Sequence, residues 1–188
     1  MAQNKRPLCS LGLDVSTTCL GICLIENQTN AVVYAKALSL AKYDHRNKKQ
    51  PVEQEFLRIA NEFNVTRVFI EAPLFLRGKT SANTITKLFH FNGWVSCFSY
   101  MIFNAYPEYV DLNKARRKFG VHVPGKEKTK ENTSKKKVLD FLVSLGYNLT
   151  EERTRSGNVK ESSYDISDAA FALYVGRCSD AEDCRVDI

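Results

Sequence analysis

The most informative part of the sequence is the stretch LGLDVSTTCLGICLIE, residues 11–26. Apolar residues lie on both sides of a connector of small hydroxyl side chains, a pattern that predicts two strands joined by a tight turn. One carboxylate, Asp14, stands at the end of the first of these strands, with no Lys or Arg within two residues of it. A carboxylate is costly to bury in an apolar strand. Asp14 is therefore either a turn residue bonded to its own backbone or part of a functional site.

Length and composition are typical of one folded domain, residues 1–188, with flexible ends at about 1–7 and 179–188. The net charge of +6 and the pI near 9.0 suggest a polyanionic partner. No apolar run reaches the roughly 18 residues of a membrane span, and no signal peptide is visible. We therefore expect a cytoplasmic location and no membrane partner. The cysteines lack zinc-ligand spacing, and three of them lie in apolar runs and are expected to be buried: Cys19, Cys23 and Cys97.

Further along the chain, apolar patterns predict three more strands and four helices. The strands are expected at residues 31–38, 65–71 and 108–112, and the helices at 51–64, 81–104, 135–147 and 164–176. Short polar turns between the first three strands favour an antiparallel meander, and the later alternation of helices and strands favours a mixed sheet. The expected fold class is α/β, with a five-stranded mixed sheet, three strands antiparallel and two parallel, flanked by helices. The helix at 81–104 is rich in apolar residues, which suggests a largely buried helix.

Three more carboxylates stand in settings like that of Asp14. Glu71 ends the strand at 65–71, and Asp165 and Asp168 lie three residues apart in the expected first turn of the last helix. Acids at a helix start can have a purely structural role, in which they accept hydrogen bonds from the backbone and interact favourably with the helix dipole. If the strands of Asp14 and Glu71 are parallel neighbours, however, the four acids can meet at one edge of the sheet.

Four carboxylates around one cleft repel each other unless cations bind. Carboxylates and water are the ligands that Mg²⁺ and Mn²⁺ prefer, and two such ions can activate a water and stabilise the leaving oxygen of a phosphodiester. Residues 114–137 contain ten Lys or Arg against two Glu, a local charge of +8, which suits a phosphate backbone. Together these features predict a metal-dependent nuclease.

The sequence resembles the RuvC-type Holliday junction resolvases of the RNase H-like superfamily, in particular their phage members, over roughly residues 10–177. The motifs that carry the resemblance are LGLD at 11–14 with Gly21, VFIE at 68–71 before a loop and a long helix, ARR at 115–117, the basic helix start at 135–137, and Asp165-x-x-Asp168-Ala169.

The resemblance implies an RNase H-like fold and a homodimer that resolves four-way DNA junctions in a bacterial or phage-infected cell. It implies that Asp14, Glu71, Asp165 and Asp168 are metal-binding catalytic acids, with two Mg²⁺ or Mn²⁺ ions per site and no nucleotide cofactor. Asp14 would bridge both ions, Glu71 and Asp165 would complete the two sites, and Asp168 would bind a metal or orient a water. The long helix at 81–104 would contribute to the dimer interface.

The resemblance also suggests which side chains contact DNA. Lys136, with its neighbour Lys135, is expected to reach the scissile phosphate as a catalytic residue, although a solvated helix start explains both lysines equally well. The aromatic that stacks at the junction centre is assigned to Phe75, for which a buried loop anchor is an equally good explanation. The complete set of expected DNA-binding residues is Phe75, Arg77, Lys79, Arg116, Arg117, Lys118, Lys126, Lys128, Lys130, Lys135, Lys136 and Lys137.

Three other interpretations stay open. Residues 14–18 with Gly21 also resemble the first phosphate loop of the sugar-kinase and actin-like ATPases, although those proteins duplicate the domain and no second Gly-rich phosphate loop is evident here. The chain could be a DNA-binding module whose acids serve only as caps and turns. It could also be a nuclease of the same fold that acts on flaps, on other branched DNA or on RNA.

Overall fold

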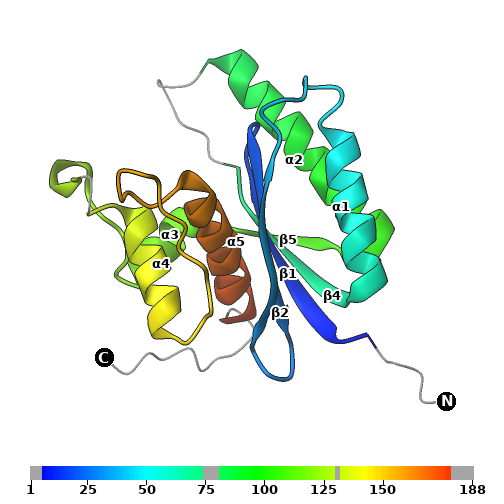
Figure 1. Cartoon of the computed structure of the whole chain (residues 1–188). Coiled ribbons are helices and arrows are strands. Elements are labelled where there is room, and N and C mark those ends of the chain that lie inside the picture. Colours follow the sequence, from blue (N-terminus) through cyan, green and yellow to red (C-terminus); the bar gives the residue numbers. More distant parts are fainter. Residues whose placement is uncertain (1–5, 74–80, 130–131, 179–188) are drawn as a thin grey trace.

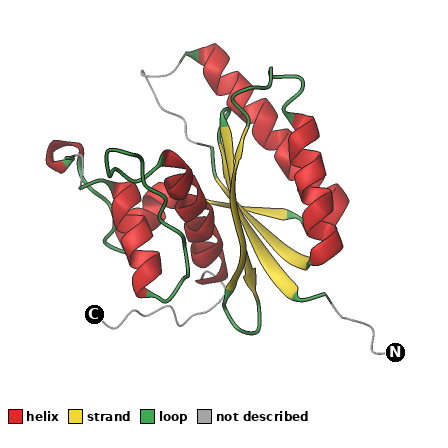
Figure 2. Cartoon of the chain, in the orientation of Figure 1, coloured by secondary structure: helices red, strands yellow, loops and turns green. Residues whose placement is uncertain are grey.

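The computed structural model of the chain describes residues 6–73, 81–129 and 132–178. Its centre is a five-stranded sheet with the strand order β3-β2-β1-β4-β5 (Figures 1 and 2). β1, β2 and β3 form an antiparallel meander, whereas β4 pairs parallel with both β1 and β5. This arrangement confirms the α/β fold class with its mixed sheet. The strands are β1 (Leu8–Val15), β2 (Cys19–Glu26), β3 (Val32–Ser39), β4 (Asn64–Glu71) and β5 (Pro107–Val110).

Helices cover both faces of the sheet (Figure 1). α1 and α2 pack on one face, α5 packs on the other, and α4 packs against α5. The helices are α1 (Lys49–Glu62), α2 (Ala82–Phe103), α3 (Leu112–Lys118), α4 (Ser134–Ser144) and α5 (Glu161–Cys178), with a 3₁₀ turn η1 (Gly125–Glu127). Within the described residues, every helix is too short or too polar to cross a membrane.

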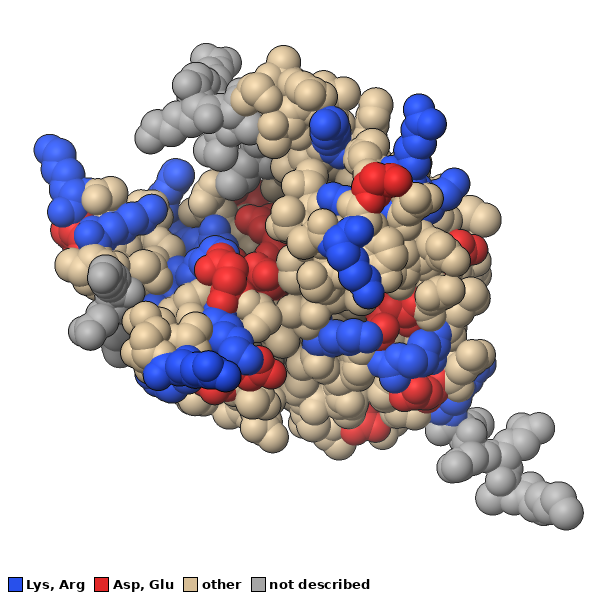
Figure 3. Space-filling view, turned by 45° about the horizontal axis from the view of Figure 1, so that its top comes forward, with Lys and Arg blue, Asp and Glu red and all other residues tan. Residues whose placement is uncertain are grey.

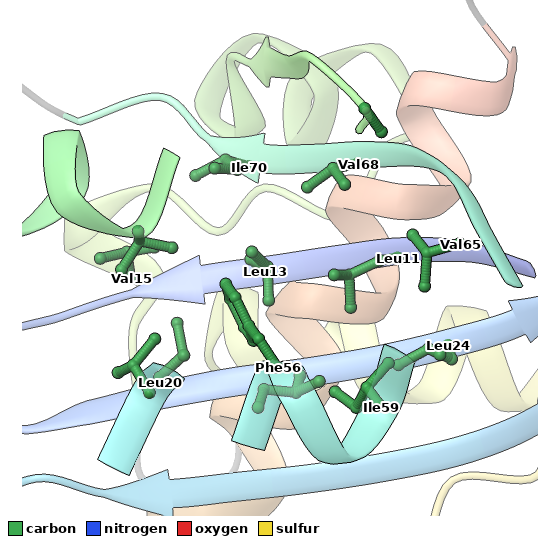
Figure 4. Packing of buried hydrophobic residues seen from close by; sticks show 14 of the residues in the cluster. Leu11, Leu13, Val15, Leu20, Leu24, Phe56, Ile59, Val65, Val68 and Ile70 are labelled. Carbon is green, nitrogen blue, oxygen red and sulfur yellow. The ribbon is translucent and has the colours of Figure 1, made fainter. Parts of the chain in front are cut away.

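The strands present alternate residues to two separate hydrophobic clusters, because successive side chains of a strand point to opposite faces. Leu11 and Leu13 of β1 join the cluster under α1 and α2, part of which Figure 4 shows. Phe69 of β4 joins the other cluster, under α5. By the same alternation, Gly12 and Asp14 of β1 lie on the α5 face. The acid of β1 therefore points to the same side of the sheet as the last helix.

Glycines allow α5 to approach the sheet very closely. A Cβ atom on Gly12 would lie 2.1 Å from the carbonyl oxygen of Ala169, and one on Gly21 would lie 2.1 Å from that of Asp165. Real Cβ atoms are not found at such distances, so no other residue fits at either position without displacing the helix. The contact at Gly21 places the backbone of Asp165 directly over the sheet beside Asp14.

Two features differ from the expectation in the region after β5. The helix α3 was not predicted, because seven residues are too few to show a helical period; Asp111 caps it by accepting a hydrogen bond from the Lys114 N–H. The last helix begins at Glu161 rather than at residue 164. Its first turn is polar, so hydrophobic periodicity did not reveal it.

The expectation of a largely buried helix at 81–104 is wrong for the chain by itself. Only Phe91, Asn92, Val95 and Ser99 of α2 are buried. The helix lies on the outside of the molecule and shows one side to solvent, so Cys97 is exposed rather than buried. Cys23 is buried as expected, and Cys19 is half-buried.

Candidate active site

The acids of β1 and β4 lie side by side at the same edge of the sheet. β1 and β4 are parallel neighbours in which Leu13 pairs with Ile70, so the next residues, Asp14 and Glu71, are adjacent at the carboxyl ends of their strands. This confirms the predicted pairing of the two strands. Asp14 is not the residue that closes the following turn. Ser16 does so, because its hydroxyl oxygen accepts a hydrogen bond from the Cys19 N–H.

The last helix brings two more carboxylates to this edge. Asp165 and Asp168 lie in the second turn of α5, because the helix begins at Glu161; their expected position in the first turn is wrong. Only the first four N–H groups of a helix lack intrahelical partners, so Asp168 cannot serve as a cap. Its side chain is 4% exposed and that of Asp165 is 15% exposed. Asp168 is therefore buried and Asp165 half-buried, and capping does not explain the buried Asp168.

Among the described residues, two cations face the four acids. Arg116 Nη2 of α3 lies 2.6 Å from Asp168 Oδ1, and its Nη1 lies 4.0 Å from Glu71 Oε1. Lys135 Nζ of α4 lies 3.8 Å from Asp165 Oδ1 and also pairs with Glu161. This positive charge thus comes from two helices, α3 and α4, that contain cations of the basic residues 114–137. Figure 3 shows acidic side chains in a hollow of the surface, with Lys and Arg side chains beside them.

Burial and mutual repulsion make the four acids difficult to ionise together. Burial raises the pKa of Asp14 well above its usual value, and repulsion by Glu71 and Asp168 and a hydrogen bond with Glu71 raise this pKa further. Burial also raises the pKa of Glu71, again with repulsion by Asp168. The pKa of Asp168 is raised by burial despite Arg116, and that of Asp165 is raised by burial despite Lys135. Arg116 and Lys135 therefore compensate the four acids only in part, which is typical of a functional site.

The donor set suits a hard divalent cation, since carboxylate oxygens are the ligands that Mg²⁺ and Mn²⁺ prefer. The groups able to hold such ions are Asp14, Glu71, Asp165 and Asp168. In the described part of the chain, no group of three or more His, Cys, Asp or Glu side chains is arranged to hold a metal as it stands. Arg116 and Lys135 lie at the acids instead. The chemistry of the acids fits the predicted metals, and metal binding stays a prediction.

The two lysines at the start of α4 point to different partners. Lys135 lies at the acids, as described above. Lys136 Nζ pairs with Asp140 and lies 3.7 Å from Glu151 Oε2, so its charge is engaged outside the cluster. The catalytic role of Lys136 stays a prediction, and Lys135 is the lysine that lies beside a candidate metal ligand.

Among the expected DNA-binding residues, Arg116 lies inside the acid cluster rather than on the surface. Five others are exposed on α3, on α4 or around η1: Arg117, Lys118, Lys126, Lys128 and Lys137. Four lie outside the described residues: Phe75, Arg77, Lys79 and Lys130.

The structure adds Cys19 to the site. Burial raises the pKa of its thiol to about 12, and a hydrogen bond to Asp165 contributes to this shift. From its apolar neighbours in the sequence, Cys19 was expected to be only a small buried hydrophobic residue. The alternation of side chains along β2 could have placed Cys19 at the site. Cys19 and Gly21 are two residues apart, so both face the side of the sheet on which Asp165 lies.

No protein-family model matches the chain, and no curated protein matches its sequence. Solved structures do match its fold. Thermus thermophilus RuvC in complex with a Holliday junction substrate is 14% identical, with a TM-score of 0.58, and the match covers 90% of this chain and 96% of that one. Another Thermus thermophilus RuvC structure is 14% identical, with a TM-score of 0.55, and covers 89% and 96%.

The yeast mitochondrial Holliday junction resolvase Ydc2 is 13% identical, with a TM-score of 0.54, and the match covers 92% of this chain and 78% of that one. At such identities the likeness shows the fold. The chain therefore has the RNase H-like fold of the RuvC-type resolvases, as its sequence motifs implied.

Proposed function

We propose that this chain is a metal-dependent endonuclease that cuts branched DNA, with four-way junctions as its substrate. The observation that carries the proposal is the convergence of four carboxylates, Asp14, Glu71, Asp165 and Asp168, from two parallel strand ends and one helix. Neither turn closure nor helix capping accounts for Asp14 or Asp168. Two proteins that share the fold support the substrate class, since one was solved with a Holliday junction substrate and another is a junction resolvase.

Each acid has a position that suggests its role. Asp14 lies on β1 in the middle of the sheet, so we assign it the central place, with Glu71 and Asp165 on either side and Asp168 holding a water or an ion. Two Mg²⁺ or Mn²⁺ ions, when bound, would supply an activated water and stabilise the leaving oxygen. Lys135, within 3.8 Å of Asp165, holds positive charge where the phosphate must approach these acids.

The DNA backbone would lie along the exposed cations of α3, α4 and η1. Such contacts are electrostatic, so binding should weaken steeply with salt. Of the two lysines on α4, we propose that Lys135 acts at the reacting phosphate. Lys136, which pairs with Asp140, extends the positive surface.

We further propose that two copies act together, because resolution of a four-way junction requires two cuts. A large apolar surface on and after α2 supports an interface there: Tyr100, Met101 and Tyr106 are 40%, 70% and 75% exposed. Sedimentation of the free protein and of its junction complex would test this, and a monomer in both would contradict it.

The direct test of the function is cleavage of a labelled synthetic four-way junction, beside linear duplex and flap substrates, in Mg²⁺, Mn²⁺ and EDTA. We expect paired symmetric nicks in the junction that are absent in EDTA and in Asp14→Asn. Glu62→Gln is the matched control, because it makes the same carboxylate-to-amide change at an exposed position at the end of α1. It should cut like the natural protein.

The other outcomes are equally informative. Preferred cutting of flaps would retain the site and change the substrate to branched DNA in general. Tight junction binding without cleavage in either metal would contradict the catalytic role and would identify a DNA-binding module.

A further inference from the structure

The most unusual residue at the site is Arg116. It belongs to the basic residues 114–137, and the other cations on α3, which are Lys114, Arg117 and Lys118, are exposed. Its side chain instead reaches from α3 across to α5 and β4, where it contacts Asp168 and approaches Glu71. An arginine that served only to bind DNA would remain on the surface with its neighbours.

The environment of Arg116 is poorly suited to a permanent structural ion pair. The side chain is only 11% exposed, and its partner Asp168 is 4% exposed. The Nε–H of Arg116 is buried and has no hydrogen-bond partner. Buried polar groups are nearly always satisfied in folded proteins, so an unpaired one needs an explanation. A buried pair also loses hydration, which offsets much of its attraction.

The guanidinium contacts the acids that a metal would need. Asp168 and Glu71 are two of the four candidate ligands, and Nη1 and Nη2 of Arg116 lie at one oxygen of each. A cation and the guanidinium at such a position would repel each other. The described residues also contain no set of three ligands ready for a metal, as expected if Arg116 holds part of the cluster.

We propose that Arg116 is an internal counter-cation that holds Asp168 and Glu71 in the metal-free protein and that a divalent ion must displace to bind. Arg116 is thus a positioning residue that lowers metal affinity and stabilises the empty cluster. This inference rests on the proposed function, since it assigns the acids to a metal.

The test is Mg²⁺ binding without DNA, measured by calorimetry and by the rise of the unfolding temperature with Mg²⁺ concentration. Arg116→Gln should bind Mg²⁺ roughly tenfold more tightly than the natural protein, because the competing charge is gone. In EDTA the same variant should unfold at a lower temperature, since Asp168 loses its cation. Arg117→Gln is the matched control: it removes the same charge from the adjacent, exposed position and should leave both quantities unchanged.

Arg116→Lys keeps the charge and gives a second measurement if the Gln variant folds poorly. Its Mg²⁺ affinity should stay within a few-fold of the natural value. Two results would overturn the inference: Mg²⁺ binding by Arg116→Gln that is unchanged or weaker, or Arg117→Gln and Arg116→Lys binding Mg²⁺ as tightly as Arg116→Gln. Either result would leave the proposed function standing, because Mg²⁺-dependent cleavage could persist. Absence of Mg²⁺ binding in every variant would overturn both the inference and the proposed function.

Discussion

Buried acids occur on both faces of the sheet, in opposite electrostatic settings. On the face covered by α1, the single carboxylate of Glu55 accepts hydrogen bonds from Tyr34, Lys36 and Arg58, the last at 2.8 Å from Nη2. Burial by itself would raise the pKa of Glu55, but the hydrogen bonds from Lys36, Tyr34 and Arg58 outweigh it, and the pKa is lowered. On the face covered by α5, burial raises the pKa of all four site acids, and repulsion by other site acids raises it further for Asp14, Glu71 and Asp168.

The difference separates a structural acid from a functional one. Glu55 accepts hydrogen bonds from three side chains and joins β3 to α1, so it stabilises the fold and requires no further ligand. In the described part of the chain the site acids have only Arg116 and Lys135 as cationic partners, so their repulsion costs stability in the folded chain. The same molecule thus satisfies the charge of Glu55 and leaves an acid cluster that costs stability. This difference indicates that the cluster has a role outside folding.

The largest expected effect is on cleavage. Asp14→Asn should reduce single-turnover cutting of a junction by on the order of a thousandfold or more, because metal stabilisation of the transition state amounts to several kcal/mol. Glu55→Gln, the same chemical change at the other buried acid, should retain the natural rate at a temperature where the variant is folded. If both variants lost activity equally, the distinction between the two faces would be wrong.

The next effect concerns the close packing of α5. Gly21→Ala should lower the free energy of unfolding by about 3 kcal/mol, since the new methyl group would overlap the carbonyl oxygen of Asp165. It should also reduce cleavage, because displacing α5 moves two acids but leaves Glu55 in place. Urea unfolding and the cleavage rate measure the two effects.

Gly93→Ala is the control for this change, because a Cβ at that position in α2 meets nothing within 4 Å. It should be stabilising by about 0.5–1 kcal/mol, as expected when alanine replaces glycine inside a helix. A Gly21→Ala protein of natural stability and activity would show that α5 does not depend on this contact.

Loss of the Glu55 charge should have a smaller effect on stability. Glu55→Gln should lower the free energy of unfolding by about 1–3 kcal/mol, the usual contribution of hydrogen bonds to a charged group. Asp14→Asn should change stability in the opposite direction in EDTA, because it removes one of the repelling charges. Urea unfolding of both variants in EDTA would show whether their effects differ in sign.

The pH dependence of stability should be the smallest effect. The lowered pKa of Glu55 gives a stabilisation that is present above its unfolded-state pKa and is lost as the pH falls through its folded-state pKa. The raised pKa values of the site acids act with the opposite sign. Their unfavourable contribution is largest above the folded-state pKa values and diminishes as the pH falls and the acids bind protons.

Unfolding in EDTA from neutral to acidic pH would resolve the two contributions. We expect Asp14→Asn to gain less stability than the natural protein as the pH falls through the folded-state pKa values of the site acids. Glu55→Gln should lose less stability than the natural protein at still lower pH, as the pH falls through the folded-state pKa of Glu55. Identical pH profiles for the two variants would contradict the opposite signs.

Several parts of this arrangement could be predicted from the sequence, because they depend on local patterns. The strands of Asp14 and Glu71 have long apolar runs, so the acids at their ends stood out and parallel pairing placed them together. The spacing of Asp165 and Asp168 correctly put them on one side of a helix. Their place in the helix was wrong, since the polar residues 161–163 gave no periodic signal.

Other features depend on contacts between distant parts of the chain. Arg116 and Asp168 are 52 residues apart, and nothing near Arg116 distinguishes it from Arg117, which stays exposed. The exposure of Met101 and Cys97 likewise depends on what covers α2, which composition cannot reveal. Of the three side chains that donate to Glu55, only Arg58 is near it in the sequence; Tyr34 and Lys36 come from β3, and no local pattern pairs them with Glu55.

The most direct test of the contrast between Glu55 and the site acids is an NMR titration of the side-chain carboxyl carbons, first in EDTA and then in Mg²⁺. We predict that in EDTA Asp14 titrates above, and Glu55 below, the usual range for its residue type, and that Mg²⁺ lowers the titration midpoint of Asp14 but leaves Glu55 unchanged. A normal midpoint for Asp14 in EDTA, or midpoints that do not respond to Mg²⁺, would contradict the claim that the four acids are short of positive charge and bind a cation.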